Sequence, residues 1–105
     1  MTVWLVHPVE QDLSSAKQWG EFRTISDRYI YADQIRDDKR IPRENQDKLL
    51  KAADKFDPKT DYFLLIGDQL QLVAFAAVLA DFHRSFMVLR YDRKAEGYVP
   101  VLIES

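Results

Sequence analysis

The chain has no cysteine, and it has only three glycines and four prolines among its 105 residues. The lack of cysteine excludes disulfide bonds, thiolate zinc sites and cysteine nucleophiles. Neither the G-x-G-x-x-G nor the G-x-x-x-x-G-K-[ST] phosphate-binding motif is present. These absences remove the most recognisable nucleotide and metal signatures, so we expect no cofactor and no metal site.

The chain also lacks a strong excess of either charge. Its 17 acidic and 15 basic residues give a net charge of −2, whereas nucleic-acid-binding domains usually carry a basic excess. The N-terminal stretch from Met1 to Pro8 has no basic segment followed by a long apolar one, which a signal peptide would need. We therefore expect a soluble protein of the cytoplasm.

The most apolar stretch, residues 61–82, is interrupted once, by a Gly-Asp pair. A membrane-spanning helix needs about 20 consecutive apolar residues, so neither piece is long enough and we expect no membrane contact. Residues 62–66 have the length and composition of a buried strand. Asp68 and Gln71 match the D-x-x-Q capping box of a helix over residues 69–82. Because this helix is apolar nearly all round, we expect it to be covered on more than one side.

Patterns earlier in the chain indicate the N-terminal elements. Residues 3–6 are an apolar run, typical of a strand that is buried on both faces. Residues 11–20 indicate a short helix, and residues 22–31 indicate two short extended pieces. After Pro42, apolar residues recur at the spacing of an amphipathic helix, namely at Leu49, Ala52, Ala53 and Phe56.

The C-terminal part predicts a hairpin. Residues 85–92 have the composition of a strand, Gly97 lies in the turn, and residues 98–103 return as a second strand. Pro100 in that second strand favours an edge position, because proline cannot donate to a ladder. Together the elements predict a single α/β domain over residues 1–105, with a small mixed sheet, a parallel centre, an antiparallel C-terminal edge strand, and helices packed on it.

A candidate ligand site follows from this topology. If the strands at 3–6, 62–66 and 86–90 are parallel neighbours, their carboxyl ends share one rim, the edge that ligands favour in open α/β sheets. The candidate residues on this rim are His7, Asp68, Tyr91 and Asp92. A small enzyme could use the histidine and the two carboxylates in acid–base chemistry. The alternative is that these residues are helix caps and strand ends, and since no catalytic motif is present, we expect a protein that is not an enzyme.

The C-terminal hairpin is locally basic and carries two tyrosines. In proteins that bind single-stranded nucleic acid, bases stack on aromatic rings and a basic groove follows the phosphates. The candidate nucleic-acid surface consists of Arg84, Arg90, Tyr91, Arg93, Lys94 and Tyr98. The competing interpretation is that charged side chains protect an edge strand from unwanted pairing.

Three motifs in the C-terminal half carry a resemblance to a known group of proteins. Residues 61–68 read D-Y-x-L-L-x-G-D, residues 89–93 read L-R-Y-D-R and residues 98–101 read Y-V-P-V, with an alanine-rich helix after the first motif. In these features residues 61–103 resemble small uncharacterised proteins encoded by bacteriophages and prophages, although Gln69 stands where those proteins often have proline. The resemblance implies a compact α/β fold and a phage origin, and it brings no known activity.

The leading functional hypothesis is therefore a non-enzymatic accessory protein, encoded by a phage, that acts by binding another protein or by self-association. Residues 27–48 support it, because their six acidic and six basic residues cancel, which suits a protein partner better than a polyanion. Nucleic-acid binding through the C-terminal hairpin is the alternative.

Overall fold

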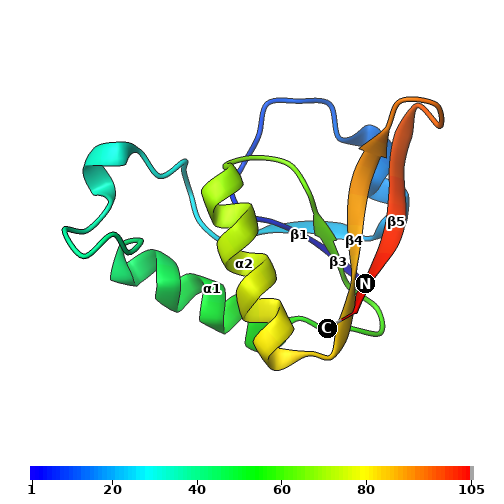
Figure 1. The fold of residues 1–105 in the computed structure, drawn as a ribbon. Coiled ribbons are helices and arrows are strands. Elements are labelled where there is room, and N and C mark those ends of the chain that lie inside the picture. Colours follow the sequence, from blue (N-terminus) through cyan, green and yellow to red (C-terminus); the bar gives the residue numbers. More distant parts are fainter. Residues whose placement is uncertain (105) are drawn as a thin grey trace.

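Five strands form a single sheet in a computed structural model that describes residues 1–104. The order across the sheet is β2-β1-β3-β4-β5 (Figure 1). The strands β2, β1, β3 and β4 run parallel, and β5 runs antiparallel to β4. The predicted α/β fold, with its parallel centre and antiparallel C-terminal edge, is thus confirmed. In chain order the strands are Thr2–Leu5 (β1), Glu21–Thr24 (β2), Tyr62–Leu64 (β3), Ser85–Asp92 (β4) and Gly97–Glu104 (β5).

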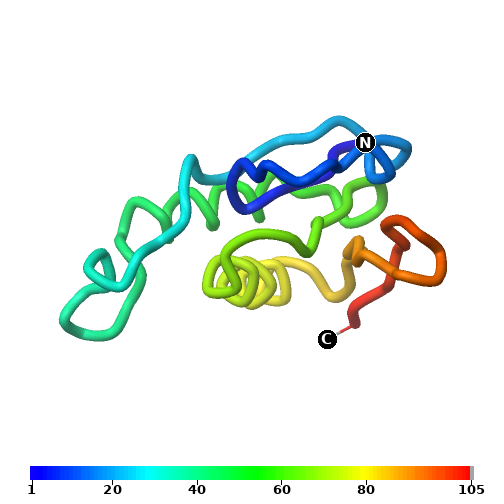
Figure 2. The backbone as a smooth tube through the Cα atoms, turned by 90° about the horizontal axis from the view of Figure 1, so that it is seen from above, coloured from blue at the N-terminus to red at the C-terminus, as the bar shows by residue number. Residues whose placement is uncertain are grey.

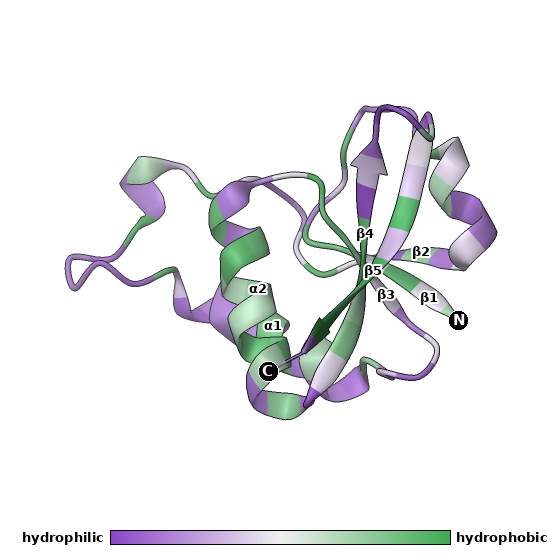
Figure 3. Cartoon of the chain, turned by 45° about the vertical axis from the view of Figure 1, so that its right-hand side comes forward, coloured by the Kyte–Doolittle hydropathy of each residue, from purple (hydrophilic) through white to green (hydrophobic). Residues whose placement is uncertain are grey.

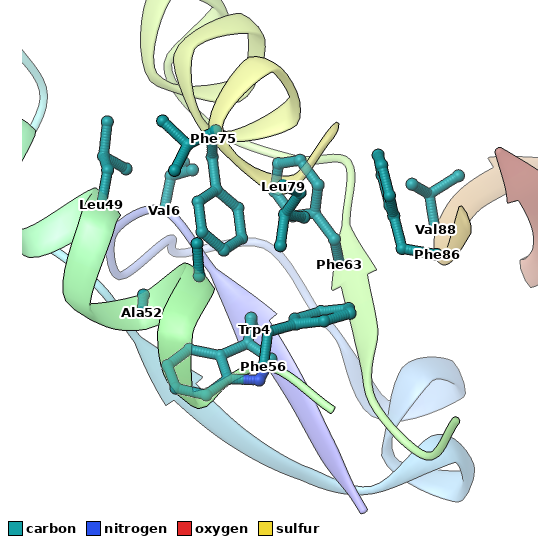
Figure 4. Packing of buried hydrophobic residues seen from close by; sticks show 12 residues of the cluster. Trp4, Val6, Leu49, Ala52, Phe56, Phe63, Phe75, Leu79, Phe86 and Val88 are labelled. Carbon is teal, nitrogen blue, oxygen red and sulfur yellow. The ribbon is translucent and has the colours of Figure 1, made fainter. Parts of the chain in front are cut away.

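Two α-helices, Arg43–Lys55 (α1) and Gln69–Phe82 (α2), lie next to each other on one face of the sheet (Figures 1 and 2). The sequence predicted both, and the apolar stripe of α1 is buried as expected. Figure 4 shows side chains of both helices meeting those of β1, β3 and β4 in the larger apolar cluster. Phe63 and Phe75 stand at its centre, fully buried, with ring centroids 4.8 Å apart in an edge-to-face arrangement.

The other face of the sheet is covered by a 3₁₀-helix, Ser14–Trp19 (η1), where the sequence predicted a short helix over a longer range. Ala16 of η1 is buried in a second apolar cluster together with Val3 and Leu5 of β1. Trp4 and Val6 belong to the first cluster. The first strand is therefore buried on both faces, as its apolar run predicted.

Two of the extended segments predicted from the sequence are shorter in the structure. Residues 22–31 contain only one strand, β2, and the chain then passes into a polar loop with a short 3₁₀-helix, Ala32–Gln34 (η2). The strand predicted at 62–66 ends at Leu64. Beyond it, the Leu65 N–H still donates to the Leu89 carbonyl across the sheet, and the chain then turns towards α2.

The structure confirms that α2 is covered on more than one side, but its outward side is open. Phe75 and Leu79 are fully buried against the sheet, whereas Val73 is 69% exposed and Leu70 is 40% exposed. The sheet covers one side of the helix and α1 contacts a second side. The outward side carries apolar residues that the fold does not bury, which Figure 3 shows as green on α2.

Candidate functional site

Asp61 lies just before β3 and is only 6% exposed. Its carboxylate accepts hydrogen bonds from the backbone N–H groups of Thr2 and Asp57, at 3.0 and 2.9 Å, and from the indole Nε1–H of Trp4 at 3.1 Å. The hydroxyl of Thr60 donates a fourth, at 3.2 Å. A buried carboxylate with four donors has its hydrogen-bonding capacity filled. Asp61 therefore ties β1 to the segment that precedes β3.

Asp68 follows β3 and is the N-cap of α2, as the sequence predicted. Its carboxylate accepts from the backbone N–H groups of Leu70 and Ile30, both at 3.0 Å, and from the side-chain amide of Gln71 at 3.1 Å. Asp68 therefore caps the helix through the N–H of Leu70, but the predicted capping box with Gln71 is not formed, because Gln71 donates to the carboxylate instead of accepting the Asp68 N–H. That N–H donates to Nε2 of His7 at 2.9 Å.

His7 is therefore held in one tautomer. Because Nε2 accepts a hydrogen bond from the Asp68 backbone, the ring proton is on Nδ1, which donates to the Pro8 carbonyl at 2.7 Å. Gly67 lies against the ring in a positive-φ conformation of 112°, and a Cβ there would stand 2.9 Å from Nε2. Both ring nitrogens are occupied, so the geometry assigns this histidine a positioning role in the corner between β3 and α2.

The structure brings His7 and Asp68 together, but it places Tyr91 and Asp92 elsewhere. Leu89 of β4 pairs with Leu64 at the end of β3, and Asp92 lies three residues further on, about 10 Å along the strand. The β4–β5 hairpin carries it away from the β3–α2 corner (Figure 1).

In that hairpin the carboxylate of Asp92 accepts from the backbone N–H groups of Lys94 and Ala95, at 2.8 and 3.2 Å. It fixes the turn, as an aspartate commonly does. Across residues 1–104, no group of three or more histidine, cysteine or acidic side chains is arranged to hold a metal ion. Of the four residues of the predicted rim, only His7 and Asp68 contact each other.

The candidate nucleic-acid residues are also divided. Arg90 and Tyr91 are neighbours on β4, so their side chains point to opposite faces of the sheet. Tyr91 packs against Tyr98 of β5, with ring centroids 5.5 Å apart, and Tyr98 is only 7% exposed. Burial raises the pKa of the Tyr98 hydroxyl, and the neighbouring Tyr91 adds to the increase.

The remaining basic residues of this set lie at opposite ends of β4. Arg84 precedes the strand, whereas Arg93 and Lys94 follow it. The eight residues between them span roughly 26 Å. Proteins that bind single strands use a continuous basic groove beside exposed aromatic rings. These six side chains do not form such a groove.

The sequence predicted that β5 is an edge strand, but it did not predict that the apolar side chains of this strand are exposed to solvent. Val101, Leu102 and Ile103 are 38%, 51% and 40% exposed, in a strand of eight residues. Such a long, apolar edge is unusual, since proteins commonly shorten or charge their edges. The signal was present in the sequence as the uninterrupted run V-L-I at 101–103.

Backbone geometry shows which groups of β5 face outward. The Leu65 N–H donates to the Leu89 carbonyl, so Leu89 directs its backbone polar groups towards β3. Pro100, which pairs with Leu89, therefore directs its backbone polar groups away from β4 and outward. Every second residue of β5 counted from Pro100 does the same. Pro100 is thus an edge proline that removes one outward donor and no ladder bond. The outward N–H donors of β5 belong to Tyr98, Leu102 and Glu104.

The apolar end of β5 lies near the C-terminal end of α2. Val101 and Ile103 pair with Val88 and Phe86, so they lie on the face of the sheet that carries the helices. In both Figure 1 and Figure 2 the C-terminal end of β5 lies near the C-terminal end of α2. Figure 3 shows that the C-terminal half of β5 is strongly apolar.

The fold and this edge define a small α/β protein with an open mixed sheet. Residues 6–105 match the family model of the Phage Pam3 gp32-like protein, and the chain belongs to that family. The predicted resemblance to phage-encoded proteins is thereby confirmed. Comparison with curated proteins and with solved structures gave no match. In the part of the chain that the structure describes, no helix has the length and apolar character needed to cross a bilayer.

Proposed function

We propose that this phage protein is a non-enzymatic accessory protein that binds an extended segment of a protein partner along β5. The observation that carries the proposal is the exposure of Val101, Leu102 and Ile103 on an eight-residue edge strand. An added strand would satisfy the outward N–H and C=O groups of β5 by β-augmentation, with alternate side chains supplying specificity.

The hydrogen bonds of Asp61, Asp68 and His7 agree with a binding role. The two carboxylates beside β3 accept hydrogen bonds from the protein's own donors, and both nitrogens of His7 are used. A general base needs a free acceptor within reach of the proton that it abstracts. Asp61, Asp68 and His7 are thus committed to holding the fold.

The nucleic-acid hypothesis stays a prediction. The division of Arg90 and Tyr91 between two faces and the burial of Tyr98 weigh against it. A test is filter binding of single-stranded DNA at low and at physiological salt, where a phosphate-dependent interaction would weaken steeply.

The proposed function is tested by photo-cross-linking in lysates of phage-infected cells. A photoreactive phenylalanine analogue at Leu102 should capture a defined protein, and the same analogue at Thr24, an exposed residue of the opposite edge strand, should not. The adduct should also disappear when an unlabelled β5 segment is added in excess. Equal capture at both positions, or none at Leu102, would contradict binding at this edge.

A further inference from the structure

We infer that the segment that binds β5 is β5 of a second copy of this chain, so that two five-stranded sheets join about a two-fold axis. This inference rests on the proposed function, since it names the occupant of the same edge. It follows from the order of side chains along the strand and from the direction of the outward N–H groups.

Only a few registers of antiparallel self-pairing make use of the outward groups of β5. If the two-fold axis passes through Val101, residues 98–104 of the two strands overlap. Pro100 then stands opposite Leu102 of the second copy, and Tyr98 stands opposite Glu104 of the second copy. The tyrosine and glutamate positions then exchange both N–H···O bonds, and each Leu102 N–H donates to a Pro100 carbonyl. Shifting the axis to either neighbouring residue shortens the overlap or sets the two prolines opposite each other.

The side chains are self-complementary in that register. Val101 meets its own copy, Val99 meets Ile103, and Leu102 meets proline, so apolar side chains face apolar ones on both faces of the joined sheet. The two Glu104 carboxylates are separated by the length of the overlap, and no charged residue lies between positions 98 and 103. Like charges opposite each other would oppose pairing, and this register has none.

The size of the contact sets its strength. An eight-residue strand paired along its length buries roughly 500 Å² on each copy, near the lower limit of a specific interface. We therefore expect a reversible dimer at micromolar concentrations. The assembly closes at two copies, because an isologous contact uses its own edge and the opposite edge, β2, carries the exposed charges of Glu21 and Arg23.

A single-cysteine experiment reads the register directly, because the chain has no cysteine of its own. In the inferred dimer, the two Val101 residues form a non-hydrogen-bonded pair with Cα atoms about 4.5 Å apart, within the range of a disulfide. Val101→Cys should give a disulfide-linked dimer on mild oxidation. Val99→Cys, on the same face, is the control, since its two copies lie about 13 Å apart and should remain unlinked.

Two proline variants test the outward donor with opposite expected signs. Leu102→Pro removes an outward N–H and no bond to β4, and it should weaken dimerisation at least about thirtyfold in analytical ultracentrifugation, because two intermolecular bonds are lost. Pro100→Ala restores an outward donor and should strengthen dimerisation about tenfold. Circular dichroism of each variant shows whether the monomer fold is retained.

A wild-type chain that stays monomeric up to millimolar concentration, or equal cross-linking of the Val99→Cys and Val101→Cys variants, overturns the dimer. Failure of the dimer is distinguishable from failure of the proposed function. Capture of a different protein by the photoreactive residue at position 102, with no self-association, would leave strand addition in place and replace only its occupant.

Discussion

The centre and the edge of the sheet use side chains in opposite ways. β3 has three residues, and the aspartates that flank it, Asp61 and Asp68, accept four and three hydrogen bonds from the protein itself. β5 has eight residues and presents apolar side chains to solvent. Polar groups are thus concentrated where the chain must be fixed. The apolar surface at the edge has no role that the fold explains, which is why we assign binding to it.

The opposite edge sharpens the contrast. β2 is four residues long, and its exposed positions include Glu21 and Arg23. The guanidinium of Arg23 lies 5.0 Å from the centroid of the Trp4 ring, so the charge is also held in place. A short, charged strand is a protected edge, whereas β5 has Pro100 as its protecting residue.

The largest effect on the centre is expected from Asp61→Ala. The change leaves four donors without their acceptor, two of them on β1, and should lower the free energy of unfolding by about 3 kcal/mol. Urea denaturation measures it, with the exposed Asp54 of α1 changed to alanine as the control. Equal losses for the two variants would show that Asp61 does not anchor β1.

Gly67→Ala should lower the free energy of unfolding by about 2 kcal/mol. The residue has a φ of 112°, which alanine rarely adopts, and its Cβ would stand 2.9 Å from the His7 ring. Gly97→Ala is the matched control, because its Cβ would lie 3.3 Å from that of Ser15 and its backbone is not in the positive-φ region. If Gly97→Ala were the more damaging of the two, the corner would be less constrained than the geometry indicates.

At the edge, Val101→Lys should change the free energy of unfolding of the monomer by no more than about 0.5 kcal/mol. The side chain is 38% exposed, so a lysine stem can lie along the surface with its ammonium group in water. The same change should abolish binding at β5. A large loss of monomer stability would mean that Val101 serves the core, and the contrast between centre and edge would fail.

The smallest effect concerns the Tyr98 hydroxyl. Its pKa lies above the ordinary value of 10.0, first because of burial and then because of Tyr91. The unfolded chain therefore loses this proton at lower pH than the folded chain. The stability that the neutral hydroxyl contributes is fully present below pH 10.0 and is lost as the pH rises towards the folded-state pKa. An absorbance titration should show one late-ionising tyrosine that is absent in Tyr98→Phe.

Local patterns were sufficient to predict much of the fold. The boundaries of α2, the N-cap at Asp68, the buried stripe of α1 and the edge position of Pro100 all follow from spacing and capping chemistry within a few residues. These features depend on neighbours along the chain, and a single sequence contains that information.

The parts that sequence reasoning missed depend on contacts between distant residues. Asp61 bonds to Thr2 and Trp4, and His7 bonds to Asp68, across separations of 57 to 61 residues. The sequence therefore suggested that His7 and Asp68 bind a ligand, although in the structure both form hydrogen bonds that hold the fold together. The exposure of α2 was missed for the same reason, because an apolar helix does not indicate which of its sides has a neighbour.

The most direct test of a binding edge is hydrogen exchange of the Leu102 amide, followed by NMR as the protein concentration or the captured partner is increased. The Leu102 N–H points away from β4 and should exchange fast in the dilute monomer, then slow at least about tenfold on association, while the amide of Thr24 on β2 keeps its rate. A Leu102 amide whose exchange is the same in dilute and associated samples would contradict strand addition at β5.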